Sequence, residues 1–377
     1  MMKKVTFIDR YIPQYRKDFY LLLRSELAKE GINLQLIYGV PNEIERSKGD
    51  FVDIDFGIKI KNLLLGIGQK KLIWQPALRY LKDSDLIIVD QANRLLINYI
   101  LQFENFLHIK KVCFWGHGKN FQSEKSDILS ELLKRQLVKH VHWWFVYNSL
   151  SLQIVEAAGF PKERITNVQN SIDTVSLAQE VKNYSSGDLE EIKNINGIKG
   201  SDIALFVGSM YAEKRLDFLI DSCYLVKKEL PDFELLLMGG GPTANIAIKA
   251  AKENPWIHYF PPKFENDKIP YFLLSKAVLM PFAVGLVMLD SFALGTPLLT
   301  THNKKNGPEI DYLIDGYNGL FAKGESISEY SNLIELFFTD KDLQRKIQFG
   351  CQQSAKYYSI QEMVGRFVSG IKETLEK

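Results

Sequence analysis

The sequence predicts an α/β protein of two domains, each built on a parallel sheet with helices on both faces. Its 377 residues are the length of two ordinary domains, which hold about 100–200 residues each. Short apolar runs alternate with helical patterns along the chain, and this alternation is typical of parallel sheets covered on both faces. A polar stretch at 184–200 interrupts the alternation once, as a connection between domains or an edge of one would.

We therefore expect an N-terminal domain at 1–185, a C-terminal domain at 186–355, and a last helix at 356–377 that packs back toward the first domain. Ligands of parallel sheets bind at the carboxyl ends of the strands. Two such domains in series are expected to face each other across a cleft lined by strand-end loops.

Six apolar runs of the first domain are predicted to be strands. They lie at Val5–Asp9, Leu34–Gly39, Asp85–Asp90, Lys111–Gly116, Trp143–Ser149 and Ile165–Asn170, with helices at Lys17–Lys29 and Asp127–Lys139. The stretch 57–82 has six basic residues, no acidic residue and many Leu and Ile side chains. This composition indicates a helix, which either lies on an anionic membrane or faces the core with a solvated basic side.

The same alternation predicts five strands in the second domain, at Ile203–Ser209, Glu234–Gly240, Ile257–Pro262, Ala277–Phe282 and Pro297–Thr301. Helices are expected at Leu216–Lys228, Thr243–Glu253, Val287–Leu294 and Ile327–Phe338. The chain from Lys341 onward has a helical pattern throughout.

Composition excludes several classes of protein. The chain is 46% apolar with a net charge of +2, as in ordinary globular proteins, and no nucleic-acid partner is expected. No apolar run is long enough for a transmembrane helix, and the first residues are predicted to form a strand, not a signal peptide. Three distant cysteines in apolar surroundings favour buried thiols in a reducing cytoplasm over disulfides or a zinc site.

Loops that follow strands of the second domain hold most of the candidate site residues. Lys214 and Arg215 stand between a glycine turn and a helix, where two cations suit a diphosphate, although a pair of surface cations is as common. The glycines at 239–241 let the backbone approach a ligand closely. Asp290 could accept hydrogen bonds from a ribose diol and Glu309 from a sugar hydroxyl, but isolated acids are also common helix-start charges.

In the first domain, His117 follows a buried strand and has a glycine on each side. It has little room to pack into a core, so it is expected to project into the cleft and to bind a phosphate or a sugar hydroxyl. The loop after the first strand carries Arg10, Tyr15 and Arg16, which would line the same cleft.

Several common catalytic motifs are absent from the sequence. It has no G-x4-G-K-[ST], no G-x-G-x-x-G after the first strand, no G-x-S-x-G, no HExxH and no CxxC. With no metal motif, phosphate charge is expected to be met by Lys, Arg and backbone N–H groups.

These pieces together resemble a retaining glycosyltransferase of the GT-B fold, with two Rossmann-like domains, from the large family four (group 1), and especially its bacterial surface-polysaccharide members. The second domain of that family carries G-R-x4-K-G, then G-x-G, then Glu-x7-Glu ending in A-x-x-G-x-P. The matching pieces are 208–215, 239–241 and 282–297. His117 resembles the family's cleft histidine, and 170–173 is similar to its N-G-V-D.

The resemblance implies that the second domain binds a nucleotide-diphosphate sugar. Lys214 matches the diphosphate lysine, whereas Ser209 stands where the family has Arg and Arg215 where it has Gly. Asp290 matches the second Glu of the pair, which holds the ribose, and Phe282 stands in place of the first. The implied donor-binding residues are Gly208, Ser209, Gly240, Gly241, Val284, Gly285, Leu286, Asp290 and Glu309.

The implied mechanism is retaining transfer without a metal or cofactor, with His117, Lys214 and Arg215 as the catalytic residues and Arg10, Tyr15 and Arg16 on the acceptor side. The acceptor is expected to be lipid-linked or an oligosaccharide in surface-polysaccharide synthesis. The enzyme would be cytoplasmic, or peripheral on the inner face of the plasma membrane. The alternatives are a nucleotide-sugar-binding protein without transferase activity, and an epimerase or phosphorylase of the same fold.

Overall fold

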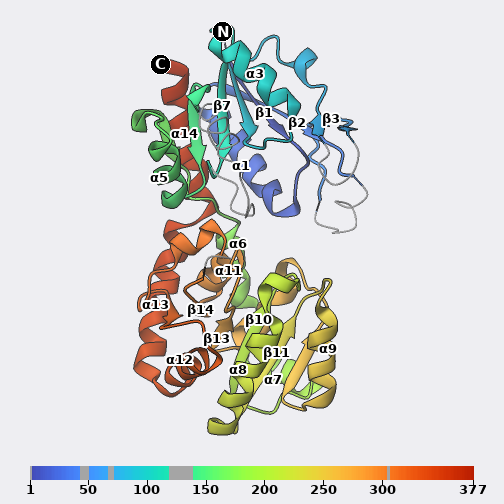
Figure 1. Ribbon diagram of the computed structural model, residues 1–377, viewed down its shortest axis with the longest axis vertical. Coiled ribbons are helices and arrows are strands. Elements are labelled where there is room, and N and C mark those ends of the chain that lie inside the picture. Colours follow the sequence, from blue (N-terminus) through green and yellow to red (C-terminus); the bar gives the residue numbers. More distant parts are fainter. Residues whose placement is uncertain (1, 43–50, 67–71, 119–138, 304–305) are drawn as a thin grey trace. The chain divides into compact units, whose positions relative to one another are not determined.

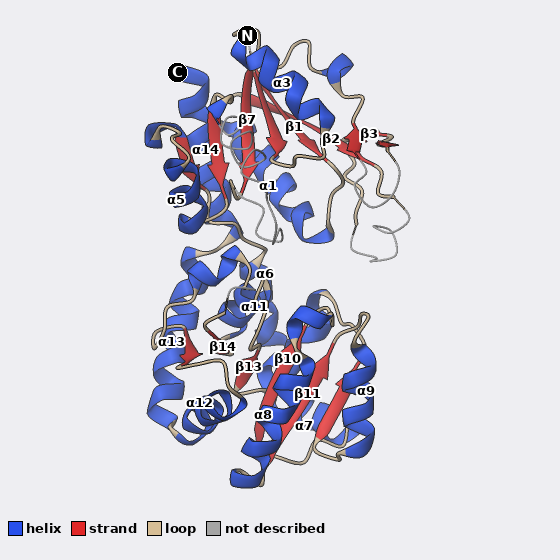
Figure 2. Ribbon diagram, viewed as in Figure 1, coloured by secondary structure: helices blue, strands red, loops and turns tan. Residues whose placement is uncertain are grey.

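The computed structural model describes residues 2–42, 51–66, 72–118, 139–303 and 306–377 (Figure 1). The contacts divide the chain into two compact units. Unit 1 consists of Met1–Ile172 and Ile360–Lys377, and unit 2 consists of Asp173–Ser359. Each unit is a parallel sheet with helices against it (Figure 2), so the predicted fold class is confirmed.

The sheet of unit 1 has seven strands in the order β3-β2-β1-β6-β7-β8-β9, all paired in parallel. The strands are β1 (Lys3–Asp9), β2 (Ile32–Gly39), β3 (Ile58–Ile60), β6 (Leu86–Asp90), β7 (Lys111–Gly116), β8 (Trp143–Val146) and β9 (Ile165–Asn167). The helices are α1 (Lys17–Lys29), α3 (Leu96–Phe106), α5 (Ser149–Ala157) and α14 (Ile360–Glu376), with short 3-10 turns at Gln14–Arg16, Leu78–Tyr80 and Lys162–Arg164.

Two apolar clusters cover the two faces of this sheet, because successive residues of each strand point to opposite sides. Phe7 belongs to the cluster that α1 and α14 complete, and Ile8 to the cluster that α3 and α5 complete. From α14, Phe367 stacks on Phe145 with the ring centroids 4.9 Å apart. The last helix of the chain is therefore part of the core of unit 1.

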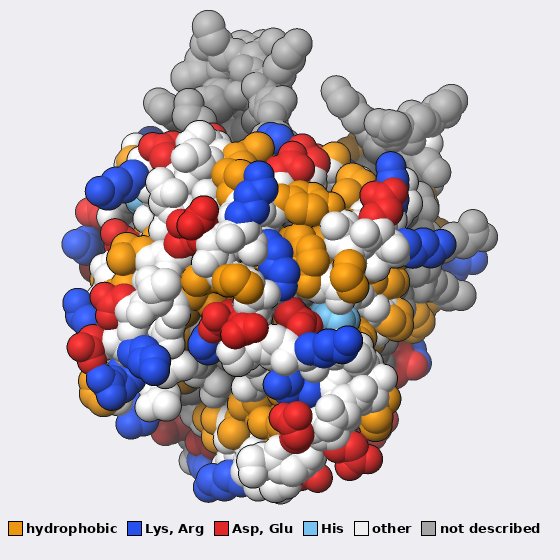
Figure 3. All heavy atoms as spheres, turned by 90° about the horizontal axis from the view of Figure 1, so that it is seen from below, with side chains coloured by type: hydrophobic (Ala, Val, Ile, Leu, Met, Phe, Trp, Pro, Cys, Tyr) orange, Lys and Arg blue, Asp and Glu red, His pale blue; other side chains and the backbone are white. Residues whose placement is uncertain are grey.

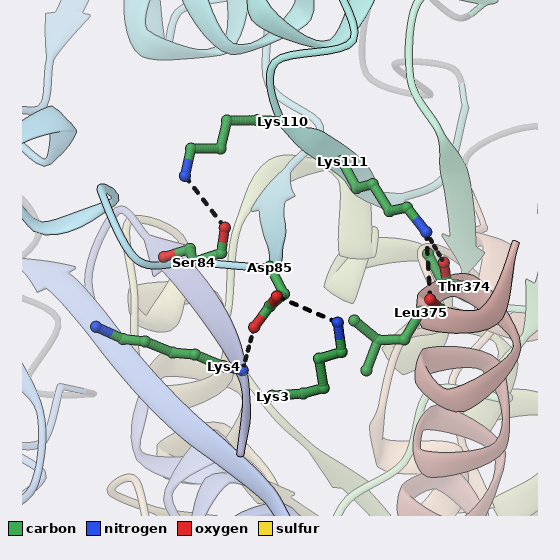
Figure 4. Close-up of polar contacts among 8 residues, drawn as sticks. All are labelled: Lys3, Lys4, Ser84, Asp85, Lys110, Lys111, Thr374 and Leu375. Atoms are coloured by element: carbon green, nitrogen blue, oxygen red, sulfur yellow. Dashed lines mark hydrogen bonds and ion pairs between the residues drawn. The ribbon is translucent and has the colours of Figure 1, made fainter. Parts of the chain in front are cut away.

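Lysines hold the amino-terminal edge of the same sheet together (Figure 4). The Lys111 ammonium donates to the carbonyl oxygens of Thr374 and Leu375, at 3.1 and 3.3 Å, and so caps the last turn of α14. Nearby, Asp85 accepts a hydrogen bond from the backbone of Lys4 at 2.8 Å and pairs with the Lys3 ammonium at 3.4 Å.

The helix predicted over 57–82 is wrong. The described residues of this stretch form β3, an antiparallel pair of strands β4 (Leu63–Leu65) and β5 (Leu72–Trp74), and the 3-10 turn at Leu78–Tyr80. Gly57, Gly66 and Pro76 interrupt the apolar pattern, and Gly66 has φ +103°, which a helix does not allow. Neither form of the helical hypothesis, membrane-bound or core-facing, therefore holds for this segment.

The sheet of unit 2 has six parallel strands in the order β12-β11-β10-β13-β14-β15. They are β10 (Asp202–Val207), β11 (Phe233–Met238), β12 (Ile257–Phe260), β13 (Ala277–Leu279), β14 (Leu298–Thr301) and β15 (Gly319–Ala322). The helices are α6 (Thr174–Glu180), α7 (Ser186–Ile195), α8 (Leu216–Glu229), α9 (Ala244–Glu253), α10 (Ile269–Leu274), α11 (Val287–Leu294), α12 (Ile327–Thr339) and α13 (Lys341–Tyr357). Short 3-10 turns lie at Val181–Asn183, Ala212–Lys214, Glu265–Lys268 and Pro308–Tyr312.

The strands of unit 2 are almost fully buried, as expected for a parallel sheet between two helical layers. On the face of unit 2 seen from below, Lys and Arg side chains are interspersed with Asp and Glu, and hydrophobic side chains form small groups (Figure 3). The polar stretch at 184–200 contains α7, which has a complete capping box and packs against α10.

Each predicted strand lies where the pattern places it, with shifts at the ends. The strand predicted over Trp143–Ser149 ends at Val146, because Asn148 instead caps α5 by accepting from the Ser151 N–H. The helix predicted at Asp127–Lys139 lies outside the described residues except for its last residue. Among the parts of the chain that the structure describes, no helix is long and apolar enough to cross a bilayer.

Candidate functional site

The centre of the unit 2 sheet is a topological switch point. From β10 the chain moves to β11 and β12 on one side, and β13 then lies on the other side of β10. The loops that leave the carboxyl ends of β10 and β13 therefore lie next to each other. Crevices of this kind are where open parallel sheets bind their ligands.

Lys214 joins these two loops. It ends the short turn after β10 and is buried, and its ammonium donates to the backbone oxygen of Ala283, which follows β13, at 2.5 Å. The Met280 sulfur lies 3.3 Å from the same nitrogen. Burial lowers the pKa of Lys214 to about 8. The predicted diphosphate lysine is thus held at the switch point by one carbonyl and no carboxylate in the described chain.

Glycines allow the loops after β10 and β11 to run against each other. A Cβ on Gly239, which has φ +149°, would lie 1.9 Å from the Gly208 oxygen. The Met210 N–H donates to the Gly240 oxygen at 2.7 Å, and a Cβ on Gly241 would lie 2.4 Å from the Met210 oxygen. The glycines at 239 and 241 are therefore required by the approach of the two backbones, whatever the ligand.

Asp290 has one satisfied and one unsatisfied carboxylate oxygen. It lies in the first turn of α11, where its Oδ2 accepts from the Lys268 ammonium at 2.7 Å. Its Oδ1 is buried without a hydrogen-bond partner among the described residues. A buried oxygen in this state is a strong acceptor that awaits a donor such as a hydroxyl. No sequence motif indicates Lys268, which comes from a 3-10 turn 22 residues earlier.

The loop between β13 and α11 carries the other predicted donor contacts. The Val284 N–H donates to the Asn306 side chain at 3.1 Å, so this predicted donor already has a partner. Gly285 has open space where a Cβ would stand, and Leu286 caps α11. Glu309 lies in the 3-10 turn Pro308–Tyr312. Ser209 is exposed beside Gly208.

Phe282 and Arg215 interact with each other. Phe282 is buried, and its ring packs edge-on against Phe218 with centroids 5.1 Å apart. The Arg215 guanidinium lies 5.6 Å from the centroid of Phe282 and is bound through two nitrogens by the carboxylate of Asp217, at 3.0 and 3.1 Å. An aromatic core thus occupies the place of the family's first Glu, and Arg215 is committed to a neighbouring acid.

In unit 1, His117 lies directly after β7. Its Nδ1 is 3.2 Å from the Ser151 hydroxyl, and its ring is 4.1 Å from that of Tyr147. Burial, together with the charge of Arg16, lowers the pKa of His117 to about 4. The imidazole is therefore neutral at pH 7 and is suited to hydrogen bonding with a hydroxyl.

Arg16 lies in an aromatic cage, not on an open loop surface. It is buried, and its guanidinium is 4.4 Å from the Trp115 ring and 5.1 Å from the Tyr15 ring.

Two acids lie at the carboxyl ends of β1 and β6, the switch point of this sheet. Burial raises the pKa of Asp9, which accepts from the Tyr20 hydroxyl at 2.5 Å, and raises that of Asp90 to about 6. Sequence patterns alone indicate neither acid as a site residue.

Arg10, the next residue after Asp9, lines a pocket of about 180 Å³ in unit 1. Lys61 and Leu64 are in the same wall, together with Val40, Pro41, Asn42, Asn62 and Ile73. The predicted acceptor-side residues thus have different surroundings: Arg10 lines a pocket, whereas Tyr15 is exposed and its ring lies against the buried Arg16.

Comparison with known proteins finds one family model that matches part of unit 2. Residues 188–349 match the model of the family described as glycosyl transferases group 1. YtcC of Bacillus subtilis (strain 168), a candidate glycosyltransferase, is 23% identical over 275 residues, and the match covers 66% of this chain. The chain spans about 60% of the length of that relative.

Several solved structures share the fold over almost the whole chain. Anabaena Alr3699/HepE, solved with UDP, has a TM-score of 0.72 at 14% identity, covering 98% of this chain and 100% of its own. A glycosyltransferase from Rickettsia africae has a TM-score of 0.71 at 14% identity, and the match covers 100% of this chain and 99% of its own. A candidate UDP-N-acetylglucosamine 2-epimerase from Listeria monocytogenes has a TM-score of 0.65 at 16% identity, and the match covers 99% of this chain and 96% of its own.

Proposed function

We propose that this chain, which carries a group 1 glycosyltransferase domain on a GT-B fold, transfers a sugar from a nucleotide-diphosphate sugar to an acceptor hydroxyl. The observation that carries the proposal is the pair of loops at the switch point of unit 2. They hold a buried ammonium, Lys214, and a carboxylate with an unsatisfied oxygen, Asp290. A ligand in which a diphosphate adjoins a ribose needs a cation for its phosphates and a hydrogen-bond acceptor for its ribose hydroxyls.

Each group has a distinct role in the donor complex. The unpartnered oxygen of Asp290 would accept hydrogen bonds from the ribose hydroxyls. The amino end of α11 and the open backbone at Gly285 would face phosphate oxygens. HepE was solved with UDP and also with UDP-glucose, so these are the first ligands to test.

During transfer, negative charge develops on the leaving diphosphate. Lys214 is preorganised to stabilise that charge, because its ammonium is already desolvated and held in place by the Ala283 carbonyl. The resemblance assigns His117 a role at the donor sugar, and a neutral imidazole suits a hydrogen bond to a hydroxyl there. We propose transfer with retention and without a metal, as in the family.

The proposed acceptor is lipid-linked or an oligosaccharide in the synthesis of a bacterial surface polysaccharide, at the inner face of the plasma membrane.

One observation favours a second candidate function, that of an epimerase. An epimerase of this fold needs acids for proton transfer, and unit 1 holds the buried carboxyl of Asp9 and the half-buried carboxyl of Asp90, both with raised pKa values. The similarity to a candidate 2-epimerase is one of fold.

Titration calorimetry with UDP and UDP-glucose tests the donor site, and chromatography of the products followed by mass spectrometry tests the reaction. Asp290→Ala and Lys214→Ala are expected to lower the affinity for UDP-glucose at least about tenfold. Free UDP with a glycosylated acceptor, or slow release of glucose, supports a transferase. A sugar nucleotide isomer of unchanged mass supports the epimerase, and unchanged affinity in both variants would refute the site.

A further inference from the structure

We infer that Ser151, held by Asn148, is a positioning residue that keeps the proton of the His117 imidazole on Nδ1 and so makes Nε2 an acceptor for a substrate hydroxyl. The three side chains come from the loop after β7 and from the start of α5. The choice of ligand group, a sugar hydroxyl and not a phosphate, rests on the proposed function. The choice of tautomer does not, because hydrogen bonds within unit 1 determine it.

The orientation of the Asn148 carboxamide is fixed by the backbone. Asn148 caps α5, and its Oδ1 accepts from the Ser151 N–H at 2.9 Å. A backbone N–H can only donate, so the side-chain atom that it meets must be the oxygen and not the NH2 group. Asn148 is buried, so the rest of the protein shields this hydrogen bond from water.

The Ser151 hydroxyl connects Asn148 to His117. It lies 2.7 Å from the same Oδ1 of Asn148, and because that oxygen has no hydrogen, the hydroxyl must be the donor. A hydroxyl has one hydrogen, so Ser151 presents only a lone pair to its other neighbour. That neighbour is Nδ1 of His117, at 3.2 Å, which must therefore carry the proton. Ser151 is fully buried, so water does not replace either partner.

Packing on two sides keeps His117 beside Ser151. Because β7 and β8 are paired, the residues that follow them, His117 and Tyr147, are neighbours, and their rings are 4.1 Å apart at an angle of 76°. The next residue, Gly118, has φ +72°, and a Cβ there would lie 2.6 Å from the Val155 side chain. The loop after β7 therefore lies directly against α5, which holds the imidazole within hydrogen-bonding distance of Ser151.

This tautomer determines what His117 can bind. Burial keeps the imidazole neutral, because it lowers the pKa of His117 to about 4, and the charge of Arg16 acts in the same direction. A neutral imidazole with its proton on Nδ1 has only a lone pair at Nε2. It can accept from a hydroxyl there, but it cannot donate to a phosphate oxygen. Of the two ligand groups expected for His117, the sugar hydroxyl is therefore the one that fits.

Helix capping alone does not explain this arrangement. In unit 2 the same cap begins α6, where Asp173 accepts from the Ser176 N–H at 3.0 Å and from the Ser176 hydroxyl at 2.5 Å. That serine is exposed and caps its helix without a histidine beside it. Ser151 makes the same bonds to its cap, but its hydroxyl is buried against an imidazole. Ser176 is therefore a matched control for the capping part of the role of Ser151.

Heteronuclear NMR of the full chain, with isotope-labelled nitrogen in its six histidines, tests the tautomer without any ligand. His117→Asn identifies the signals of His117, and a protonated ring nitrogen is distinguished from a bare one by its chemical shift. At pH 7 the wild type is expected to carry the proton on Nδ1. Ser151→Ala removes the acceptor and should lower the fraction in this form, whereas Ser151→Thr, which keeps the hydroxyl, should restore it. Ser176→Ala should leave it unchanged.

Titration calorimetry tests the ligand. Ser151→Ala should weaken the binding of UDP-glucose about threefold to tenfold. It should change the affinity for UDP less than about twofold, because UDP has no sugar for His117 to contact. In a His117→Ala background, Ser151→Ala should have no further effect, since Ser151 acts only through the imidazole. A residue that only stabilised α5 would affect both ligands alike and would not depend on His117.

The results separate this inference from the proposed function. A wild type with the His117 proton on Nε2 overturns the inference, and so does a Ser151→Ala variant that binds UDP-glucose like the wild type. A wild type that binds neither UDP nor UDP-glucose would refute the proposed donor site instead. The proton on Nδ1 would in that case still support the role of Ser151, because the NMR measurement needs no ligand.

Discussion

The ammonium of Lys268 lies 2.7 Å from Oδ2 of Asp290, and the two side chains are only 15% and 11% exposed. This pair sets the orientation of the carboxylate at the start of α11. Because Lys268 binds Oδ2, the remaining oxygen is the one left for a ligand. The ion pair therefore positions the proposed ribose-binding group without competing for its free oxygen.

Breaking this pair is expected to destabilise the fold as well as the site. Lys268→Met leaves a buried carboxylate without its partner and should lower the free energy of unfolding by about 3 kcal/mol. The matched control is Lys249→Met, which breaks an exposed pair with Glu253 at 3.8 Å and should change it by less than about 0.5 kcal/mol. Urea denaturation at pH 7 measures both. Equal effects of the two substitutions would show that Lys268 and Asp290 are not coupled.

Donor affinity is expected to fall at alkaline pH because of Lys214. Its pKa is lowered to about 8, so the ammonium is present below pH 8 and is lost above it, whereas an ordinary lysine stays charged to about pH 10. The dissociation constant for UDP-glucose should be constant from about pH 6.5 to 7.5 and then rise, approaching tenfold per pH unit. Calorimetry across this range gives the profile. Lys214→Met should flatten it and Lys249→Met should not; a flat wild-type profile would contradict the role of the ammonium.

Two glycines of unit 2 are expected to respond differently to alanine. Gly239→Ala places a Cβ 1.9 Å from a backbone oxygen at a positive φ, so it should destabilise the fold by about 3 kcal/mol or more. Gly285→Ala meets no atom within 4 Å and should leave the free energy of unfolding within about 1 kcal/mol. If a phosphate occupies that open space, the same substitution lowers UDP affinity at least about tenfold. Full affinity in Gly285→Ala would place the donor elsewhere.

Unit 1 is expected to become more stable as the pH falls from 7 to 5. The pKa of Asp90 is raised by burial from 3.8 to about 6, so the folded chain binds this proton more tightly than the unfolded chain. That contribution is fully present below about pH 3.8 and is lost as the pH rises through 6; at most it is about 3 kcal/mol. Asp90→Asn should reduce the difference between pH 5 and pH 7, and the buried Asp9, whose pKa is also raised, accounts for what remains. Denaturant unfolding at the two values checks it, and an unchanged difference in the variant would exclude Asp90 as the cause.

Local patterns in the sequence were sufficient to place the elements that carry the candidate donor site. The residues Val287–Leu294 form α11 as predicted, because Leu294 is followed by Gly295 in the left-handed conformation that ends a helix. The strand Lys111–Gly116 is also confirmed. In both cases a continuous apolar run is bounded by glycine, so the signal lies within a few residues of the element.

The parts that could not be predicted depend on partners distant in the sequence. Lys268 reaches Asp290 only because the turn before α10 folds against α11, and nothing near residue 268 marks it. Asp90 ends the strand β6, but nothing near it in the sequence shows that β6 pairs with β1 and so places Asp90 at the switch point of the sheet. The helix α3 is apolar on two sides, with Ile97 and Leu101 buried and Phe103 exposed, so its sequence pattern does not show which side faces the core. The prediction of a helix over 57–82 was wrong because amino-acid composition alone takes no account of where the glycines of this segment lie.

The position of α14 in the core of unit 1 has a consequence for biosynthesis. Phe367 and its neighbours complete one face of a sheet whose strands are all made before residue 170, whereas the helix that carries them follows the whole of unit 2 in the sequence. Unit 2 is synthesised entirely in the interval. Part of the apolar face of unit 1 therefore stays uncovered until residues 360–376 have been made, and exposed apolar surface of this kind favours aggregation of a nascent chain.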